Sequence, residues 1–272
     1  MESTEHLSAN RANWDERVDI HWGSAEYNVQ RYIDDPKAIS DVVEFDRTEI
    51  GEVAGKRLLH LQCHLGTDTL FWARLGATVT GVDFSPKAID AARRLSREAG
   101  TPGRFVVSEL YDSPSQLQEE FDVVYTSVGA ICWLPDIEGW AKVVSTFLKP
   151  GGTFYMREGH PMMWALDWDE EDLLSIVEPY FGGTGPFDDE EETSYAGEGK
   201  LKNAVSYNFK HGLGETVTAL INAGLRIEFF REHQFCEWEG SPHLRKGEDG
   251  KWRLPDRPER LPLMFSVRAV KS

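Results

Sequence analysis

The sequence predicts an α/β protein built on a doubly wound, mostly parallel sheet. Short apolar runs suited to buried strands alternate with segments of helical spacing between residues 58 and 160. Turn residues such as Gly76, Gly100 and Pro150 separate these segments. Because strands joined through helices of this length form right-handed crossovers, the strands should lie parallel in one sheet.

The first half of the sheet follows from signals along residues 58–107. Leu58 starts an apolar run typical of a central strand, and a helix with apolar spacing follows Gly66. Ser85 is a suitable N-cap, and Pro86 fits the first turn of the next helix. The expected elements are a strand at 58–61, a helix at 67–75, a strand at 78–82, a helix at 86–99 and a strand at 104–107.

The second half continues this alternation. Lys149-Pro150-Gly151-Gly152 closes a helix just before the next strand, and residues 203–209 also return to regular structure. A polar loop at 236–260, long enough for a hairpin, joins the last two strands. The expected strands are 121–126, 153–157, 225–231 and 263–270, with helices at 136–148 and 214–223.

Two segments fall outside the main domain, which we place at residues 56–160 and 201–272. Residues 1–55 are rich in aromatic side chains and predict an N-terminal helical cap over a cofactor mouth. Residues 161–200 mix acidic side chains with aromatic ones such as Trp164 and Trp168. They predict an inserted cap over the ligand crevice, and a surface loop that packs by its aromatics is the alternative.

The overall composition excludes several classes of function. A net charge of −17 and a pI near 4.9 argue against a nucleic-acid partner, whose phosphates such a surface repels. The three cysteines form no Cys-x-x-Cys pair, which argues against a disulfide framework or a structural zinc site. The chain shows no signal peptide and no run of 18 apolar residues, so we expect a cytoplasmic protein without a membrane partner.

The strand-loop-helix-strand segment at 58–83 points to a cofactor that contains adenosine. Asp83 stands at the carboxyl end of the second strand, where a carboxylate can accept hydrogen bonds from a ribose diol. The preceding loop holds one glycine, Gly66, rather than the Gly-x-Gly-x-x-Gly pattern. A pyrophosphate could therefore not lie flush against its backbone, which argues against a nicotinamide dinucleotide.

Residues 56–160 and 211–270 resemble the class I S-adenosylmethionine-dependent methyltransferases, which have a Rossmann-like fold. Five features carry the resemblance: the loop ending in Gly66, Asp83 before a capped helix, Glu109 after the third strand, the 121–125 strand, and the turn at 149–152. In this chain the family's acid-x-Gly-x-Gly-x-Gly motif reads His60-Leu61-Gln62-Cys63-His64-Leu65-Gly66. The resemblance implies that the last strand of the sheet is antiparallel.

The resemblance also implies a set of cofactor contacts with S-adenosyl-L-methionine, whose product form is S-adenosyl-L-homocysteine. The methionine part would meet the loop, and Asp83 would hold the ribose beside an adenine site formed by the residues that follow the second and third strands. We add the hypothesis that the Gln62 and His64 side chains supply polar contacts in place of glycine backbone. The implied cofactor-binding residues are Gln62, Cys63, His64, Gly66, Thr67, Asp83, Phe84, Ser85, Glu109, Leu110 and Thr126.

For catalysis, an activated sulfonium methyl requires mainly in-line alignment of the nucleophile, with removal of a proton where the nucleophile needs it. Glu158 and His160 follow the fifth strand and are the candidate bases, although His160 could equally be a structural turn histidine. Tyr27 is a third catalytic candidate. Residues expected to line a flat substrate are Tyr32, Trp133, Trp164 and His211.

The resulting hypothesis is methyl transfer to a small aromatic or heteroaromatic molecule at nitrogen, oxygen or carbon, as in secondary metabolism. We expect no metal, because His60 and His64 lie in a strand-to-loop segment rather than on one helix face. The protein could form a homodimer. Two alternatives are an NAD(P)-dependent oxidoreductase and an inactive module that binds an adenosyl ligand.

Overall fold

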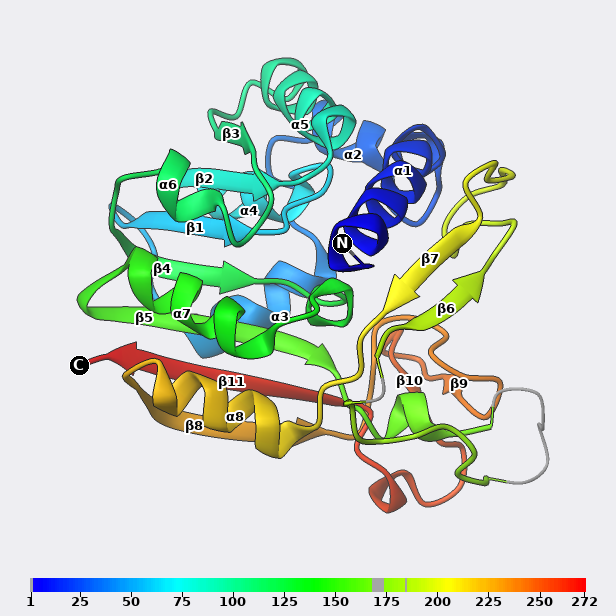
Figure 1. Cartoon of the computed structure of the whole chain (residues 1–272). Helices are drawn as coiled ribbons and strands as arrows, with labels where there is room; N and C mark the ends of the chain where they lie inside the picture. The colour runs from blue at the N-terminus through cyan, green and yellow to red at the C-terminus, as the bar shows by residue number, and fades with distance from the viewer. Residues whose placement is uncertain (1, 168–173, 184) are drawn as a thin grey trace.

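The computed structural model describes residues 2–167, 174–183 and 185–272, and it contains the predicted doubly wound sheet (Figure 1). Its seven strands run in the order β3-β2-β1-β4-β5-β11-β8. They are β1 Arg57–Leu61, β2 Thr78–Asp83, β3 Arg104–Val107, β4 Phe121–Thr126, β5 Leu148–Gly159, β8 Leu225–His233 and β11 Met264–Lys271. The last strand, β11, is antiparallel to both β5 and β8, while the other neighbours pair in parallel. The predicted fold class is confirmed.

Helices cover both faces of the sheet, because the central strands are apolar on both sides. Leu58 and Val123 face one core, whereas Leu59 and Val124 face the core on the other side of the sheet. The helices on the first face are α3 Asp41–Ile50, α4 Thr67–Arg74 and α5 Pro86–Glu98, and those on the second are α6 Ser113–Gln116, α7 Ile137–Phe147 and α8 Leu213–Asn222. The carboxyl ends of β1, β2 and β4 therefore meet at one edge, between these layers.

Strand β5 is longer than the predicted strand at 153–157. Strand β11 pairs with it from Thr153 to Gly159, which extends regular hydrogen bonding past Arg157. This pairing joins segments more than a hundred residues apart, so local sequence patterns do not set where the strand ends.

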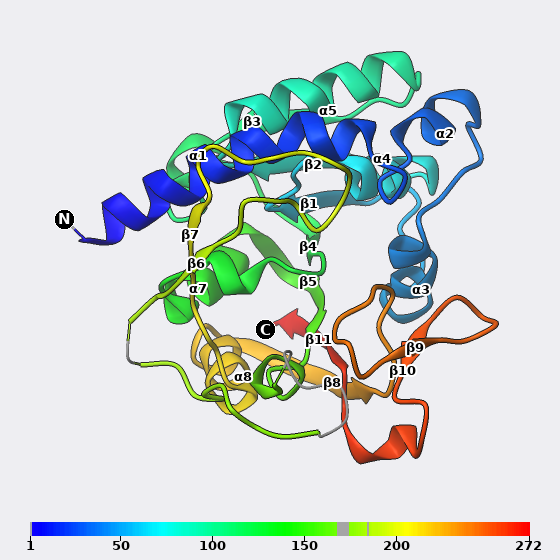
Figure 2. The same ribbon diagram turned by 90° about the vertical axis from the view of Figure 1, so that its right-hand side faces the viewer.

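The N-terminal segment is helical, as predicted, but only part of it covers the expected mouth. Helix α1 (Glu2–Gly23) lies against α5 and against β7 of the inserted segment (Figure 2). Helix α2 (Val29–Asp34) follows it and packs near α5. The prediction that this whole segment lies over the mouth is wrong for α3, because its Val43 and Ile50 are buried against the sheet face in the cluster that contains Tyr155.

The inserted segment contains a two-stranded hairpin, β6 (Phe187–Glu190) with β7 (Val205–Asn208). We call residues 185–208 the arm. The second strand, β7, lies beyond the boundary predicted at residue 200, because β6 pairs with residues 205–208. Residues 168–173, including Trp168, lie outside the described residues, as does Thr184.

The loop before β11 forms a small core of its own. Its hairpin consists of β9 (Arg245–Lys246) and β10 (Trp252–Arg253), and Cys236 and Leu254 pack against Met163 after β5. Short 3-10 turns occur at η1 Ile131–Trp133, η2 Met163–Ala165 and η3 Pro258–Arg260. Within the described part of the chain, none of the helices is both long and apolar enough to cross a bilayer.

Candidate active site

The loop after β1 keeps a glycine-like backbone at positions where glycine is absent. Gln62 and His64 have φ angles of 58° and 46°, and Gly66 has a φ of 72°. Left-handed backbone is unfavourable for residues with a Cβ atom and needs support from surrounding contacts. The loop has thus retained the path of a glycine-rich cofactor loop while gaining two polar side chains.

Gly66 is required for space as well as for its backbone angle. A Cβ atom here would lie 2.6 Å from Cε1 of Phe105 and 2.9 Å from Cβ of Ala92. We expect Gly66→Ala to lower the free energy of unfolding by about 2–4 kcal/mol, the sum of a left-handed alanine and an overpacked core. Urea denaturation measures this loss. Gly100→Ala is the matched control, because Gly100 also has a positive φ but nothing within 4 Å of a Cβ.

Asp83 joins the loop to the start of α5. Its Oδ2 accepts from the amide of His64 at 2.8 Å, and its Oδ1 accepts from the amide of Ser85 at 2.9 Å. Burial raises its pKa to about 6, although these two hydrogen bonds act in the opposite direction. Ser85 caps α5 by accepting from Ala88 and donates to Asp15 of α1. The carboxylate is thus held rigidly at the end of β2, where a ribose diol would lie.

Two buried polar atoms at the neighbouring strand ends have no hydrogen-bond partner among the described residues. They are Oε1 of Gln62, after β1, and Oγ1 of Thr126, the last residue of β4. The Gln62 amide nitrogen donates to the Ala130 carbonyl at 2.9 Å, which fixes the side chain. Unpaired buried polar atoms are costly and need explanation. An amino-acid end group that donates to Gln62 and contacts Thr126 would satisfy both, so the residues fit the methionine part of S-adenosylmethionine.

The Cys63 amide and the His60 ring are both engaged within the protein. The Cys63 amide donates to the Val82 carbonyl at 2.9 Å, so this N–H is not free for a cofactor, contrary to the expectation. His60 is buried between Thr69 (2.8 Å) and Ser127 (3.1 Å), and burial lowers its pKa to about 3. In place of the acid typical of this position, His60 ties β1 to α4 and to the loop after β4.

The adenine side of the expected site is built by the residues that follow β2 and β3. Glu109 accepts from the amides of Tyr111 and Asp112, which turns the chain after β3. Leu110 is buried, and Phe84 is partly exposed beside Asp83. Thr67 begins α4, so its amide belongs to the helix N-terminus that faces the loop.

Aromatic and histidine side chains from α1 form a roof over the loop. His64 lies between Trp14, whose ring centroid is 5.0 Å away, and His21, whose Nδ1 is 2.8 Å from Nε2 of His64. Tyr27 stacks on His21 at 4.6 Å, and its hydroxyl is 2.5 Å from that of Tyr195 on the arm. The sequence pointed to Tyr27 but missed Trp14, Arg17, His21 and Tyr195. The spacing of three or four residues between the α1 members was the available signal.

The two candidate bases after β5 are engaged in holding the structure. The Glu158 carboxylate accepts from the backbone amides of Gly129, Ala130, Ile131 and Gly159 at 2.7–3.2 Å. His160 accepts from the Met162 amide at Nδ1, and its Nε2 is 3.1 Å from Glu232. This geometry favours a loop-holding role for Glu158 and a structural turn role for His160 over proton abstraction.

The expected substrate-lining residues are spread over three regions. Trp133 lies at the mouth, 5.3 Å from the Trp14 ring, and donates to the Gly129 carbonyl. His211 lies close by, with Nε2 2.8 Å from the Leu134 carbonyl. Trp164 is 41% exposed and would contact a Cβ placed on Gly159 at the end of β5. These three surround the ends of β4 and β5.

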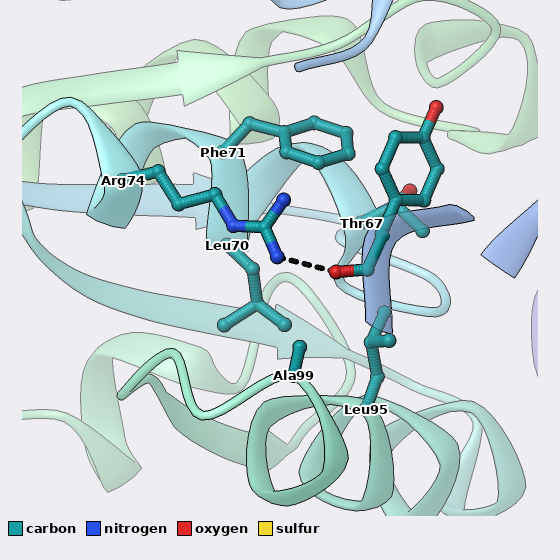
Figure 3. A pocket seen from close by; sticks show the side chains of 7 residues that line it. Thr67, Leu70, Phe71, Arg74, Leu95 and Ala99 are labelled. Carbon is teal, nitrogen blue, oxygen red and sulfur yellow. Dashed lines mark hydrogen bonds between the residues drawn. The ribbon is translucent and has the colours of Figure 1, made fainter. Parts of the chain in front are cut away.

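Tyr32 lies elsewhere. Its ring packs against Phe71 at 4.4 Å, and its carbonyl accepts from Arg74. This small hollow, lined also by Thr67, Leu70, Leu95 and Ala99, lies between the helices that flank the sheet (Figure 3). The buried Tyr32 ring therefore belongs to helix packing, and the expectation that it lines the substrate is not supported by its position.

Comparison with known proteins relates the central part of this chain to a known family of domains. Residues 59–154 match the family model described as a methyltransferase domain. This range contains the loop, Asp83, Glu109 and Thr126. This part of the chain is therefore similar to a methyltransferase domain, in agreement with the resemblance to class I S-adenosylmethionine-dependent methyltransferases.

Curated relatives of this chain match over the same region. A ubiquinone biosynthesis O-methyltransferase from Xanthomonas euvesicatoria pv. vesicatoria is 32% identical over 105 residues, which is 39% of this chain and 44% of that protein. An uncharacterized methyltransferase from Synechocystis is 35% identical over 112 residues, 40% of this chain and 50% of the relative. The matched region thus spans about half the length of these relatives.

Solved structures extend the likeness in fold to most of the chain. An S-adenosylmethionine-dependent methyltransferase from Mesorhizobium loti superposes with a TM-score of 0.59 at 24% identity, covering 85% of this chain and 99% of its own. A glycopeptide N-methyltransferase in complex with S-adenosylmethionine gives 0.54 at 18% identity, covering 85% and 92%. The part of the roof that α1 and the arm form lies outside the matched range 59–154.

Proposed function

We propose that this protein transfers the methyl group of S-adenosylmethionine to a small aromatic or heteroaromatic molecule. The observation that carries the proposal is the convergence of Asp83 with the unpaired atoms of Gln62 and Thr126 at adjacent strand ends. Asp83 fits a ribose, and the atoms of Gln62 and Thr126 fit an amino-acid end group. All three residues lie at the same edge of the sheet.

The bound cofactor supplies an activated methyl group, and this chain's residues hold the partners in line for its displacement. Asp83 would hold the ribose of the cofactor, and Gln62 would hold its amino-acid end. Trp14 and Trp133, whose rings meet edge to face at 87°, offer two aromatic faces on which a planar acceptor would stack. Burial raises the pKa of the Tyr27 phenol well above its usual range, so Tyr27 acts as a hydrogen-bond donor. Catalysis in this proposal rests on alignment and exclusion of water.

The acceptor class follows from the roof and from the surface charge. Stacking surfaces favour a planar molecule, and the net charge of −17 favours a neutral or cationic one, such as a nitrogen heterocycle, and disfavours nucleic acid. The relatives include an O-methyltransferase and an N-methyltransferase by name. An acceptor panel should therefore hold phenols, catechols, indoles and aromatic amines.

Calorimetric titration of the purified protein with S-adenosylmethionine, S-adenosylhomocysteine and NADPH tests the proposal. We expect micromolar binding of both adenosyl ligands and no binding of NADPH, because the Gln62 and His64 side chains stand where a pyrophosphate would meet the loop. Binding of NADPH alone would favour the oxidoreductase alternative. Adenosyl binding without methyl transfer to any panel member would favour the inactive binding module.

The affinity for S-adenosylhomocysteine should depend on pH through Asp83. Its pKa in the free protein is about 6, and hydrogen bonds from a ribose would lower that pKa in the complex because they stabilise the ionised carboxylate. The affinity for S-adenosylhomocysteine is then at its maximum above pH 6 and falls about tenfold per pH unit below pH 6. Calorimetry on both sides of pH 6 measures this slope. An unchanged affinity through that range would contradict the assignment of Asp83.

A further inference from the structure

Helix α1 presents a buried polar stripe to the arm. The stripe repeats every three or four residues, so its members share one face of the helix. Such a stripe is unusual, because the buried face of a surface helix is normally apolar. Its members are Asn10, Asn13, Arg17 and His21, each no more than 3% exposed.

The stripe binds the backbone of the arm. Asn10 donates to the Tyr207 carbonyl at 2.9 Å and accepts from the Tyr207 amide at 2.7 Å, which mimics a strand partner. Asn13 donates to the Asn203 carbonyl at 2.8 Å. The two elements lie side by side along β7 (Figures 1 and 2). Because the interface is polar rather than apolar, water can replace its contacts when the arm separates from α1.

The same stripe reaches the cofactor loop through His21. The ring of His21 joins Nε2 of His64 at 2.8 Å on one side and Oγ of Ser194 on the arm at 2.7 Å on the other. His64 donates its amide to Asp83. His64 therefore links the expected ribose carboxylate, through its backbone amide, to His21 and the arm, through its ring.

This roof covers the carboxylate that would hold a ribose. Asp83 is 6% exposed, and Trp14, His21 and Tyr27 crowd the His64 ring beside it. The cavity of about 360 Å³ in this region lies between α1 and α5, lined by Trp22, Lys87 and Arg94 rather than by the loop.

We propose that His21 and His64 are positioning residues that latch the arm over the bound cofactor, so that ribose binding at Asp83 and closure of the arm are coupled. The proposal rests on the proposed function, because it assigns the ligand at Asp83 to the adenosyl cofactor. His21 bridges the loop after β1 and the arm, and Ser194 is its contact on the arm.

Hydrogen–deuterium exchange of the arm, with and without S-adenosylhomocysteine, tests the latch. In the wild-type protein, ligand at about 100 times its Kd should slow exchange of the Asn203 and Tyr207 amides by up to about a hundredfold. In His21→Ala this ligand-linked slowing should be lost, and in His21→Gln, which can still bridge by hydrogen bonds, it should be partly restored. Ser194→Ala should reduce the slowing without any change to α1, which keeps the test informative if His21→Ala folds poorly.

His6→Ala is the matched control. His6 packs on Tyr207, with ring centroids 4.3 Å apart, and so contacts the same arm from the same helix without reaching the loop. It should keep the ligand-linked slowing. Equal slowing in wild type, His21→Ala and Ser194→Ala would overturn the latch while leaving the function intact. Failure of the wild-type protein to bind S-adenosylhomocysteine in calorimetry would instead overturn the proposed function.

Discussion

Replacing Asp83 by asparagine should weaken S-adenosylhomocysteine binding by about a hundredfold or more while the protein remains folded. Each hydrogen bond from a ribose hydroxyl to a carboxylate contributes about 1.5–3 kcal/mol, and an amide can accept at only one of its two terminal atoms. Asparagine can accept only one of the two backbone amides that Asp83 binds, but burial already disfavours the charged form of Asp83 and raises its pKa to about 6, so we expect a reduced stability without unfolding. Calorimetry gives the affinity and thermal denaturation gives the stability.

Asp68→Asn is the matched control for that experiment. Asp68 is a second acid, partly buried, whose pKa burial raises to about 6, but its Oδ1 accepts from Ser40 at 2.8 Å. It lies two residues beyond the loop glycine, so both variants remove a charge from the same region. A similar loss of affinity in both variants would mean that general electrostatics, rather than a ribose contact at Asp83, accounts for the effect.

Replacing Arg157 by alanine should lower the free energy of unfolding by about 3–5 kcal/mol. Arg157 on β5 is fully buried, and its Nε lies 2.6 Å from Oδ1 of the equally buried Asp46 on α3. Its Nη1 also lies 2.7 Å from Glu237 in the loop before β11. Removal of the guanidinium leaves Asp46 as an uncompensated buried charge. Urea denaturation of the two proteins measures the loss.

The pH dependence of that loss identifies its cause. Burial raises the pKa of Asp46 even though Arg157 beside it lowers it, so removal of Arg157 raises that pKa further. Because the folded-state pKa then lies above the unfolded value, protonation favours the folded state. The difference in free energy of unfolding between the wild-type protein and Arg157→Ala should therefore become smaller as the pH is lowered. Arg47→Ala should cost under about 0.5 kcal/mol, since its pair with Glu44 is exposed on both sides. A deficit independent of pH would indicate lost packing instead.

Much of the cofactor side could be predicted from the sequence because it depends on neighbours in the chain. The end of β2 at Asp83, the N-cap at Ser85 and the turn glycine at Gly66 are each local signals, and the structure places all three as expected. The sheet order follows from alternation of strands and helices together with short connections. These features are determined by backbone propensity and by the periodicity of apolar residues.

The roles of the polar side chains could not be predicted in this way. Glu158 and His160 stand at a strand end, as a catalytic base would, yet Glu158 is occupied by the amides of the loop after β4. His21 carries no local signal for a contact with His64, which lies 43 residues further along the chain. Such pairings depend on which elements pack together, and residue spacing does not encode them.

The sequence by itself therefore determined the doubly wound sheet, the edge where a cofactor would lie and the acid that would hold its ribose. The tertiary structure alone decided which polar groups at that edge remain unpaired, which histidines meet above the loop, and that the arm docks on α1 through hydrogen bonds. The physical reason is range: strands, helices and caps arise from contacts within a few residues, whereas the roof is made by side chains brought together from α1, the loop after β1 and the arm.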